Sequence, residues 1–231
     1  MEKRKAIFFD LDGTLLPMDL EEFIKTYFGL LAKWMPHYDA NAMIGALWQG
    51  TKAMMVNDGT MTNENRFWTV FSDLLGQQIR EEEPNLEVFY RTEFHKAKAV
   101  CGSNPAARQI IDLAHEKADL VVLATNPLFP RCAVESRLSW IGLKPEDFDY
   151  ITSYENSSNC KPTAAYYQTI CRNLNLDPSQ CLMVGNDLKE DGYGASLAGL
   201  QVHIVTDCLI THGLHCDDYS HSKFCDLDRY L

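Results

Sequence analysis

The chain has 231 residues with 21 basic and 32 acidic side chains, which gives a net charge of −11 and an isoelectric point near 5.0. Nucleic-acid phosphates are bound by clustered positive charge, so this balance excludes a nucleic-acid polymer as the main partner. The content of 46% hydrophobic and 23% charged residues is typical of a globular protein of one domain, with or without a smaller insertion. No stretch approaches the ~20 apolar residues that a membrane span requires.

The eight cysteines are scattered between Cys101 and Cys225, and none forms a C-x-x-C pair. Secreted disulfide frameworks are shorter and denser than this. The apolar run that follows the basic start of the chain stops after four residues, at Asp10, which is too short for the core of a signal peptide. We therefore expect a cytoplasmic protein with reduced thiols.

Four short apolar runs predict strands that are buried on both faces, as in a parallel sheet. In chain order they cover residues 6–10, 119–125, 181–185 and 201–205. Helices are predicted between them, starting from an Asn104-Pro105 cap and reaching about residue 117, and then over residues 129–141, 163–173 and 189–198. Strands that alternate with helices indicate a doubly wound α/β sheet.

Residues 17–100 interrupt this alternation. They contain four helical stretches, at residues 20–35, 41–56, 62–75 and 84–100, and no convincing buried strand. A structureless loop of this size is improbable in a compact protein. We expect a helical cap domain over residues 17–100, inserted into a core formed by residues 1–16 and 101–231. Residues 207–231 are polar and show no periodic pattern.

Polar side chains follow three of the predicted strands and precede one predicted helix. Ligands of open α/β sheets bind at the carboxyl ends of the strands, so these side chains are candidates for one site. Taken singly, each has an ordinary explanation: an acidic turn, a Thr-Asn-Pro turn, an exposed lysine, or carboxylates that complement a helix dipole. In chain order the motifs are Asp10-Leu11-Asp12-Gly13-Thr14, Thr125-Asn126, Lys161-Pro162 and Gly185-Asn186-Asp187 with Asp191.

This order of motifs resembles the haloacid dehalogenase superfamily, with a helical insertion at the place of a type 1 cap, as in the phosphoglycolate phosphatases. The resemblance covers residues 1–16 and about 101–231. It implies a Rossmann-like core and a Mg²⁺-dependent phosphatase that acts on a small phosphorylated metabolite through an aspartyl-phosphate. This sequence departs from the usual pattern in Cys160, which precedes Lys161 where many members have glycine, and in Asn186, which separates Gly185 from Asp187.

The resemblance also implies a role for each motif residue. Asp10 would be the nucleophile and Asp12 the general acid and base. Lys161 would offset the charge of the transferred group, and Thr125 with Asn126 would hold its oxygens. Mg²⁺ would be bound by the following groups: the carboxylates of Asp10 and Asp187 and the main-chain carbonyl of Asp12. Asp191 would orient Lys161 or a metal-bound water.

Asp12 distinguishes activities within the superfamily. The dehalogenases lack a carboxylate there because a halide leaving group needs no proton, whereas an alkoxide does. A phosphomutase or phosphotransferase on the same scaffold remains an alternative, as does a non-catalytic module that responds to phosphate. The sequence leaves open the substrate, the oligomeric state and the cap residues that contact substrate. It also leaves open the role of the Cys- and His-rich segment 203–225, whose spacings match no usual zinc pattern.

Overall fold

In the computed structural model, which describes residues 3–231, six parallel strands form one sheet in the order β3-β2-β1-β4-β5-β6. Met1 and Glu2 of the expected core lie outside the described residues. The strands are β1 Arg4–Phe9, β2 Ala118–Leu123, β3 Tyr150–Ile151, β4 Cys181–Gly185, β5 Gln201–Val205 and β6 Ser220–Ser222. The doubly wound α/β sheet predicted from the apolar runs is confirmed.

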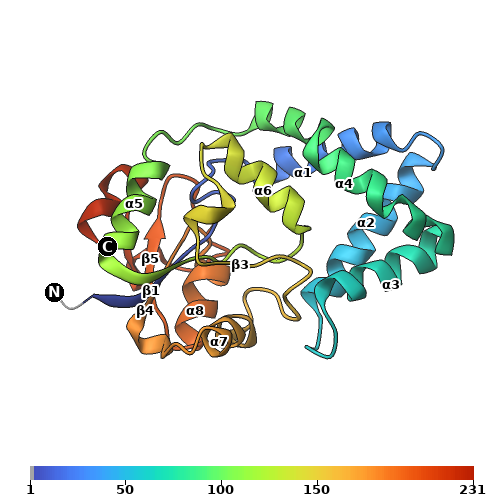
Figure 1. Cartoon of the computed structure of the whole chain (residues 1–231). Coiled ribbons are helices and arrows are strands. Elements are labelled where there is room, and N and C mark those ends of the chain that lie inside the picture. The colour runs from blue at the N-terminus through green and yellow to red at the C-terminus, as the bar shows by residue number, and fades with distance from the viewer. Residues whose placement is uncertain (1–2) are drawn as a thin grey trace.

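Helices cover both faces of the sheet because successive side chains of a buried strand point to opposite faces. Ile7 and Phe9 of β1 pack on the face covered by α5 and α6, whereas Ala6 and Phe8 pack on the face covered by α7 and α8 (Figure 1). The helices are α5 Ala107–Lys117, α6 Arg131–Trp140, α7 Ala164–Asn173 and α8 Gly194–Leu197. A six-residue π-helix, η5 Leu188–Tyr193, leads into α8.

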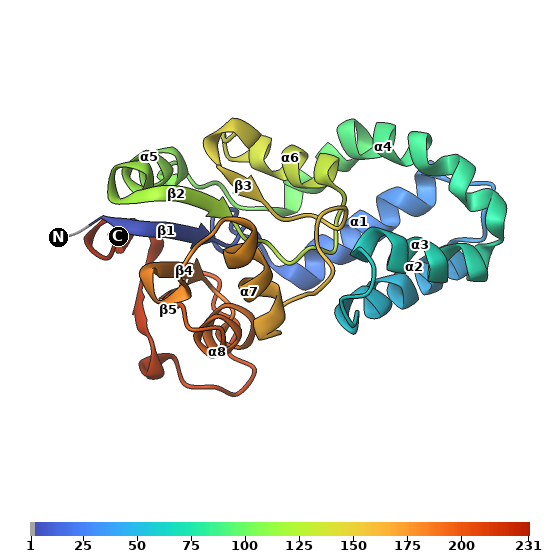
Figure 2. The same cartoon turned by 60° about the horizontal axis from the view of Figure 1, so that its bottom comes forward.

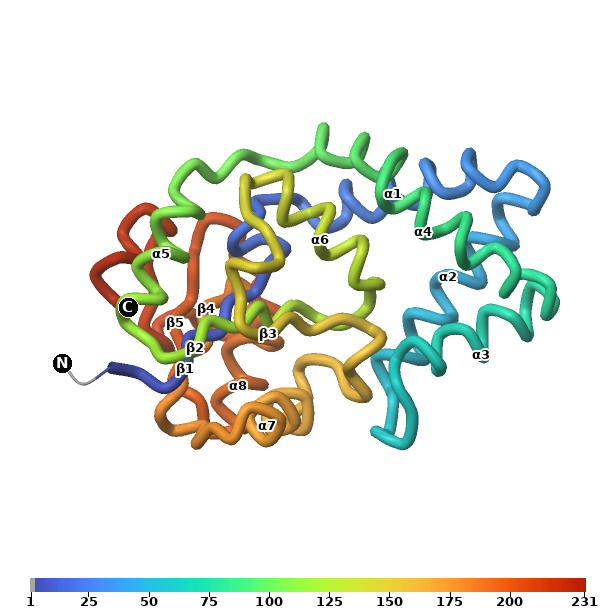
Figure 3. The backbone as a smooth tube through the Cα atoms, in the orientation of Figure 1, coloured from blue at the N-terminus to red at the C-terminus, as the bar shows by residue number. Residues whose placement is uncertain are grey.

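The chain leaves the core after β1, builds a helical cap, and returns before α5 (Figure 3). Arrowheads of β1 and β2 point toward this cap, so the carboxyl ends of the strands face it (Figure 2). The start of β1 and the C-terminus lie on the side of the sheet away from the cap. The cap elements are α1 Leu20–Trp34, α2 Ala40–Met55, α3 Asn63–Leu75, η1 Gln77–Glu82, α4 Glu83–Arg91 and η2 Glu93–Val100.

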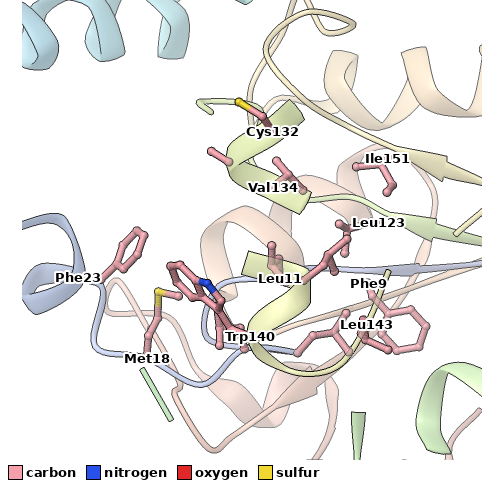
Figure 4. Packing of buried hydrophobic residues seen from close by; sticks show 14 of the residues in the cluster. Phe9, Leu11, Met18, Phe23, Leu123, Cys132, Val134, Trp140, Leu143 and Ile151 are labelled. Atoms are coloured by element: carbon pink, nitrogen blue, oxygen red, sulfur yellow. The ribbon is translucent and has the colours of Figure 1, made fainter. Parts of the chain in front are cut away.

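Apolar side chains connect the cap to the core without a break. Leu11 follows β1, and Met18 and Phe23 lie where the cap begins; Trp140 reaches them from α6 (Figure 4). The rings of Phe23 and Trp140 are 6.4 Å apart, centre to centre, in an edge-on arrangement. The base of the cap is therefore held against α6 by a shared apolar core.

The cap is also fastened to the strand-end loops by Asn63, the first residue of α3. Its main-chain N–H donates to Ser157 O (2.7 Å), and its side-chain amide donates to Pro127 O (3.1 Å) and Cys160 Sγ (3.3 Å). Asn63 is fully buried, so these bonds satisfy polar groups that have no access to water. Both side-chain bonds reach loops that carry predicted site residues.

Four of the predicted helices differ from the helices of the structure. The helix predicted over residues 84–100 breaks at Thr92, whose hydroxyl donates back to Val88 O (2.7 Å). The helix predicted from residue 129 begins at Arg131, because Pro130 restricts the residue before it. Asn104 does not cap α5; its amide donates to Leu15 O, and the helix begins at Ala107. The fourth, predicted over residues 189–198, is η5 followed by α8.

The polar end of the chain is more ordered than its sequence indicates. It contains the short strand β6 and two 3₁₀ turns, η6 Cys216–Asp218 before this strand and η7 Phe224–Arg229 after it. His203 of β5 is buried, and its two ring nitrogens bond Ser220 Oγ (2.8 Å) and Ser222 Oγ (2.9 Å) of β6. Burial lowers the pKa of His203 to about 4, so this imidazole is neutral and joins two strands.

Candidate active site

The predicted site residues meet at the carboxyl ends of β1, β2 and β4. Asp10 follows β1, its main-chain N–H donates to Val184 O of β4 (2.9 Å), and its side chain is 10% exposed. Gly13 turns the chain with φ +89°, and a Cβ there would lie 2.3 Å from the side-chain amide of Asn186. The glycine of the D-x-D-G-T motif therefore allows Thr14 and Asn186 to approach, and the Thr14 hydroxyl donates to Asn186 Oδ1 (2.9 Å).

Lys161 lies between two carboxylates in the interior of the site. Its Nζ donates to Asp10 Oδ1 (2.8 Å) and to Asp191 Oδ1 (2.6 Å), and all three side chains are buried. Burial alone would lower the pKa of Lys161, but the two carboxylates outweigh it and raise this pKa well above its usual value. The structure thus places a permanent positive charge against Asp10.

Asp191 supports this arrangement from η5. Its Oδ2 accepts the main-chain N–H groups of Asn186 (3.0 Å) and Asp187 (3.1 Å), while Oδ1 accepts from Lys161. A Cβ on Gly185 would lie 2.2 Å from this carboxyl group, so only glycine fits there. The orienting role predicted for Asp191 toward Lys161 is supported by these contacts and remains a proposal.

Asp187 lies two residues after β4 and caps the start of η5. Its Oδ1 accepts the main-chain N–H groups of Lys189 and Glu190 (2.8 Å each), and Oδ2 lies 2.7 Å from His212 Nε2. The sequence offered no sign of the His212 contact, because this histidine lies in the segment without a pattern. Through this contact the C-terminal segment reaches Asp187, a predicted metal ligand.

The donor atoms of the predicted metal set suit Mg²⁺, which prefers carboxylate, carbonyl, water and phosphate oxygens. Among residues 3–231, no three or more His, Cys, Asp or Glu side chains are grouped so that they could hold a metal ion by themselves. The predicted set does not require one, because its third protein ligand is the main-chain carbonyl of Asp12. Lys161 supplies one positive charge to the two buried carboxylates of Asp10 and Asp191, so with both carboxylates ionised the cluster carries one negative charge in excess. Burial raises the pKa of Asp10 to about 8 although Lys161 opposes this rise, which shows that the ionised carboxylate needs further positive charge. A bound cation would offset the remaining negative charge.

Asn126 has a partner that the sequence did not reveal. Its side-chain Nδ2 donates to both carboxylate oxygens of Glu190 (3.0 Å each), and its Oδ1 is buried without a hydrogen-bond partner among the described residues. Burial raises the pKa of Glu190 to about 7. Thr125 is buried, and its main-chain carbonyl accepts the hydroxyls of Thr152 and Tyr166. The amide of Asn126 thus faces Glu190, while its predicted contact with phosphate remains a prediction.

Arg137 is the principal site residue that sequence reasoning missed. It lies on α6, is fully buried, and forms an ion pair with Asp12 Oδ2 through its Nη1. Its Nε donates to Ala133 O (3.2 Å), and its guanidinium carbon lies 4.3 Å from the ring centre of Phe129. Asp12 Oδ1 and Arg137 Nη2 are buried without a partner among residues 3–231. One oxygen of Asp12 is therefore fixed by Arg137, and the other has no hydrogen-bond partner in the described part of the chain.

A pocket of about 510 Å³ lies between the cap and the strand-end loops. It is lined by side chains from α1 to α4 and by residues 128–132, which follow the Thr125-Asn126 pair. This volume falls in the range of small-molecule sites. Phe129 lines the pocket and also contacts Arg137, so only two side chains separate the pocket from Asp12.

A family profile described as haloacid dehalogenase-like hydrolase matches residues 4–199, and the chain belongs to this family. It is 27% identical over 190 residues to an N-acetylmuramic acid 6-phosphate phosphatase of Pseudomonas putida, with 80% of this chain and 76% of the relative covered.

Two solved structures share the fold. A predicted phosphoglycolate phosphatase of Haemophilus somnus is 20% identical, with a TM-score of 0.60 and coverage of 100% and 99% of the two chains. The YfnB protein of Bacillus subtilis, solved bound to magnesium, is 21% identical, with a TM-score of 0.54 and coverage of 88% and 89%.

No helix among the described residues has both the length and the apolar character needed to cross a bilayer.

Proposed function

We propose that the protein is a Mg²⁺-dependent phosphatase that hydrolyses a small phosphorylated metabolite through a phosphorylated Asp10. The observation that carries this proposal is the buried Asp10–Lys161–Asp191 cluster at the end of β1, with Asp12 two residues away. A carboxylate held against a cation is suited to attack phosphorus, since the cation offsets charge on the phosphoryl oxygens. The phosphatase names of the relatives agree with this assignment.

The reaction would proceed in two displacements. A carboxylate oxygen of Asp10 attacks phosphorus, the bond between phosphorus and the alcohol oxygen breaks, and Asp12 gives a proton to the departing alkoxide. Asp12 then takes a proton from water as the water oxygen attacks phosphorus, and the bond between phosphorus and Asp10 breaks to release phosphate. Lys161 offsets charge in both steps, and the pairing with Arg137 holds Asp12 in place.

Mg²⁺ would be held by the carboxylates of Asp10 and Asp187 and by the carbonyl of Asp12, where it would neutralise charge on the phosphate and orient it. The direct test is phosphate release from p-nitrophenyl phosphate and a panel of metabolite phosphates, with Mg²⁺ and with EDTA. Release that requires Mg²⁺ supports the proposal. Transfer of the phosphoryl group to an added sugar or alcohol in preference to water would favour a phosphotransferase instead. Equal release with EDTA would contradict the metal requirement.

Replacement of Asp12 tests the acid–base role. We expect Asp12→Asn to slow hydrolysis of alkyl phosphates by about 10²–10⁴-fold, the usual range for loss of a general acid–base group. Asparagine can still accept a hydrogen bond from Arg137, so this change disturbs the buried pair less than Asp12→Ala would. Steady-state kinetics of both variants measure the effect. A rate within about threefold of the original would contradict the role.

Arg137 is expected to act as a positioning residue for Asp12. Arg137→Lys keeps the charge but loses the planar guanidinium, so we expect kcat to fall by about 10–100-fold with a smaller change in KM. The loss is expected to be larger for alkyl phosphates than for p-nitrophenyl phosphate, because p-nitrophenolate departs without a proton. A merely structural role would lower both rates equally, and equal losses would contradict the assignment.

A further inference from the structure

We propose that the pocket between the cap and the core binds the alcohol part of the substrate, and that this alcohol is apolar, large enough to carry an aromatic ring, and positively charged. This inference rests on the proposed phosphatase function and adds the class of the leaving group.

The walls are mainly apolar and rich in aromatic side chains. Trp68 and Phe71 of α3 are buried, and Phe67 stacks on Phe71 with their ring centres 4.9 Å apart. Further aromatic side chains come from the other cap helices and from the core: Tyr27, Phe28, Trp48, Tyr90, Phe129 and Tyr154. A surface of this kind binds apolar groups by burial, and the faces of the rings attract cations. A small polar metabolite such as phosphoglycolate would leave most of this volume unfilled.

The charges on the walls are not balanced. Arg91 and Arg131 are the two basic lining residues, and both are already paired: Arg131 Nε lies 2.9 Å from Glu135, and Arg91 lies 3.0 Å from Glu87. Three further lining carboxylates have no ion pair of 4.0 Å or less among residues 3–231; they belong to Glu64, Glu83 and Glu155.

These three carboxylates are close enough to influence one another. Burial and then the charges of Glu155 and Glu83 raise the pKa of Glu64, while Arg80 opposes this rise without lining the pocket. Glu155 Oε1 accepts the main-chain N–H of Arg131 (2.8 Å), and its Oε2 is buried with no hydrogen-bond partner in the described part of the chain. An ammonium group would supply both the missing donor and the missing positive charge, whereas an anionic group would be repelled.

The pocket lies beside the predicted site, although Asp10, Asp12 and Lys161 do not line it. The N–H of Glu64 donates to Tyr154 O (2.9 Å), which joins the acidic cap wall to the loop after β3. Phe129 also lines the pocket and contacts Arg137, the partner of Asp12. In this proposal the alcohol of a bound monoester extends from the predicted acid past Phe129 into the cavity.

Three para-substituted benzyl alcohols test the inference without catalysis: one with an aminomethyl group, one with a methyl group and one with a carboxylate. Binding is measured by calorimetry, and by tryptophan fluorescence because Trp48 and Trp68 line the pocket. We expect the cationic alcohol to bind at least about tenfold more tightly than the neutral one, and the anionic one most weakly. Glu64→Gln and Glu155→Gln should reduce this preference, whereas Glu116→Gln, an exposed position on α5, should leave it unchanged.

The phosphates of the same alcohols separate the two proposals. Hydrolysis with kcat/KM in the same order, weakened in the Glu64 and Glu155 variants, supports both. Binding in this order without hydrolysis of any of the three would overturn the phosphatase proposal and leave the ligand class of the pocket supported. Hydrolysis with no preference, or with the carboxylate compound or N-acetylmuramic acid 6-phosphate preferred, would overturn the inference and leave the phosphatase proposal intact.

Discussion

Asp10→Asn is expected to abolish phosphate release, with turnover reduced by at least about 10⁴-fold, because the change removes the proposed nucleophile. The variant should fold. Lys161 keeps Asp191 as its partner at 2.6 Å, and the substitution takes a buried negative charge out of a site where burial opposes it. Steady-state phosphate release, with Mg²⁺ present, measures the loss.

The control for this variant is thermal unfolding, which should give a midpoint equal to or above that of the original protein. A second control, Asp119→Asn, removes a carboxylate that is paired with surface lysines on the far end of β2, and it should keep full activity. Retention of more than about one hundredth of the activity in a well-folded Asp10→Asn protein would show that another group attacks phosphorus.

Lys161→Met is expected to have the largest effect on stability. Lys161 is the only cation hydrogen-bonded to Asp10 and Asp191 within the described chain, and both carboxylates are buried. Removal of one partner from a buried ionic cluster leaves charge without compensation and costs about 3–5 kcal/mol. Urea unfolding in EDTA should show this loss in the free energy of unfolding, and phosphatase activity should be lost as well.

The origin of that loss can be checked in a double variant. Lys161→Met with Asp191→Asn removes one of the two uncompensated charges, so it should regain part of the stability although two native contacts are gone. Activity should not return, since the charge beside Asp10 is still missing. If the double variant were less stable than Lys161→Met alone by the full effect of Asp191→Asn, packing and not charge would explain the loss.

Much of the core could be predicted because local sequence determines it. Residues 6–9 form an uninterrupted apolar run, which is characteristic of a strand buried on both faces, and they lie in β1. The D-x-D-G-T motif follows β1 directly, so the parallel order of the strands brings Asp10 to the same edge as Thr125 and Asp187. The pairing of β1 with β2 and β4 thus brings motifs that are distant in the sequence together in one site.

Arg137 could not be found in this way, because a charged residue on a helix is normally read as exposed. Helix α6 is buried on most of its surface, between the sheet and the cap, and this follows only from tertiary packing. The contacts of Glu190 with Asn126 and of His212 with Asp187 likewise join segments that no sequence pattern relates. Strand β6 was missed because Ser220-His221-Ser222 is polar and lies at an edge of the sheet.

The most direct test of the central claim is to trap phosphate on Asp10. Asp12→Asn should still be phosphorylated by p-nitrophenyl phosphate, whose leaving group needs no proton, but it should hydrolyse the product slowly because no base activates water. Acid quenching followed by intact-mass and peptide analysis should then reveal one added phosphoryl group, on Asp10. Continued phosphate release with no adduct on Asp10, or an adduct at another residue, would contradict the proposed mechanism.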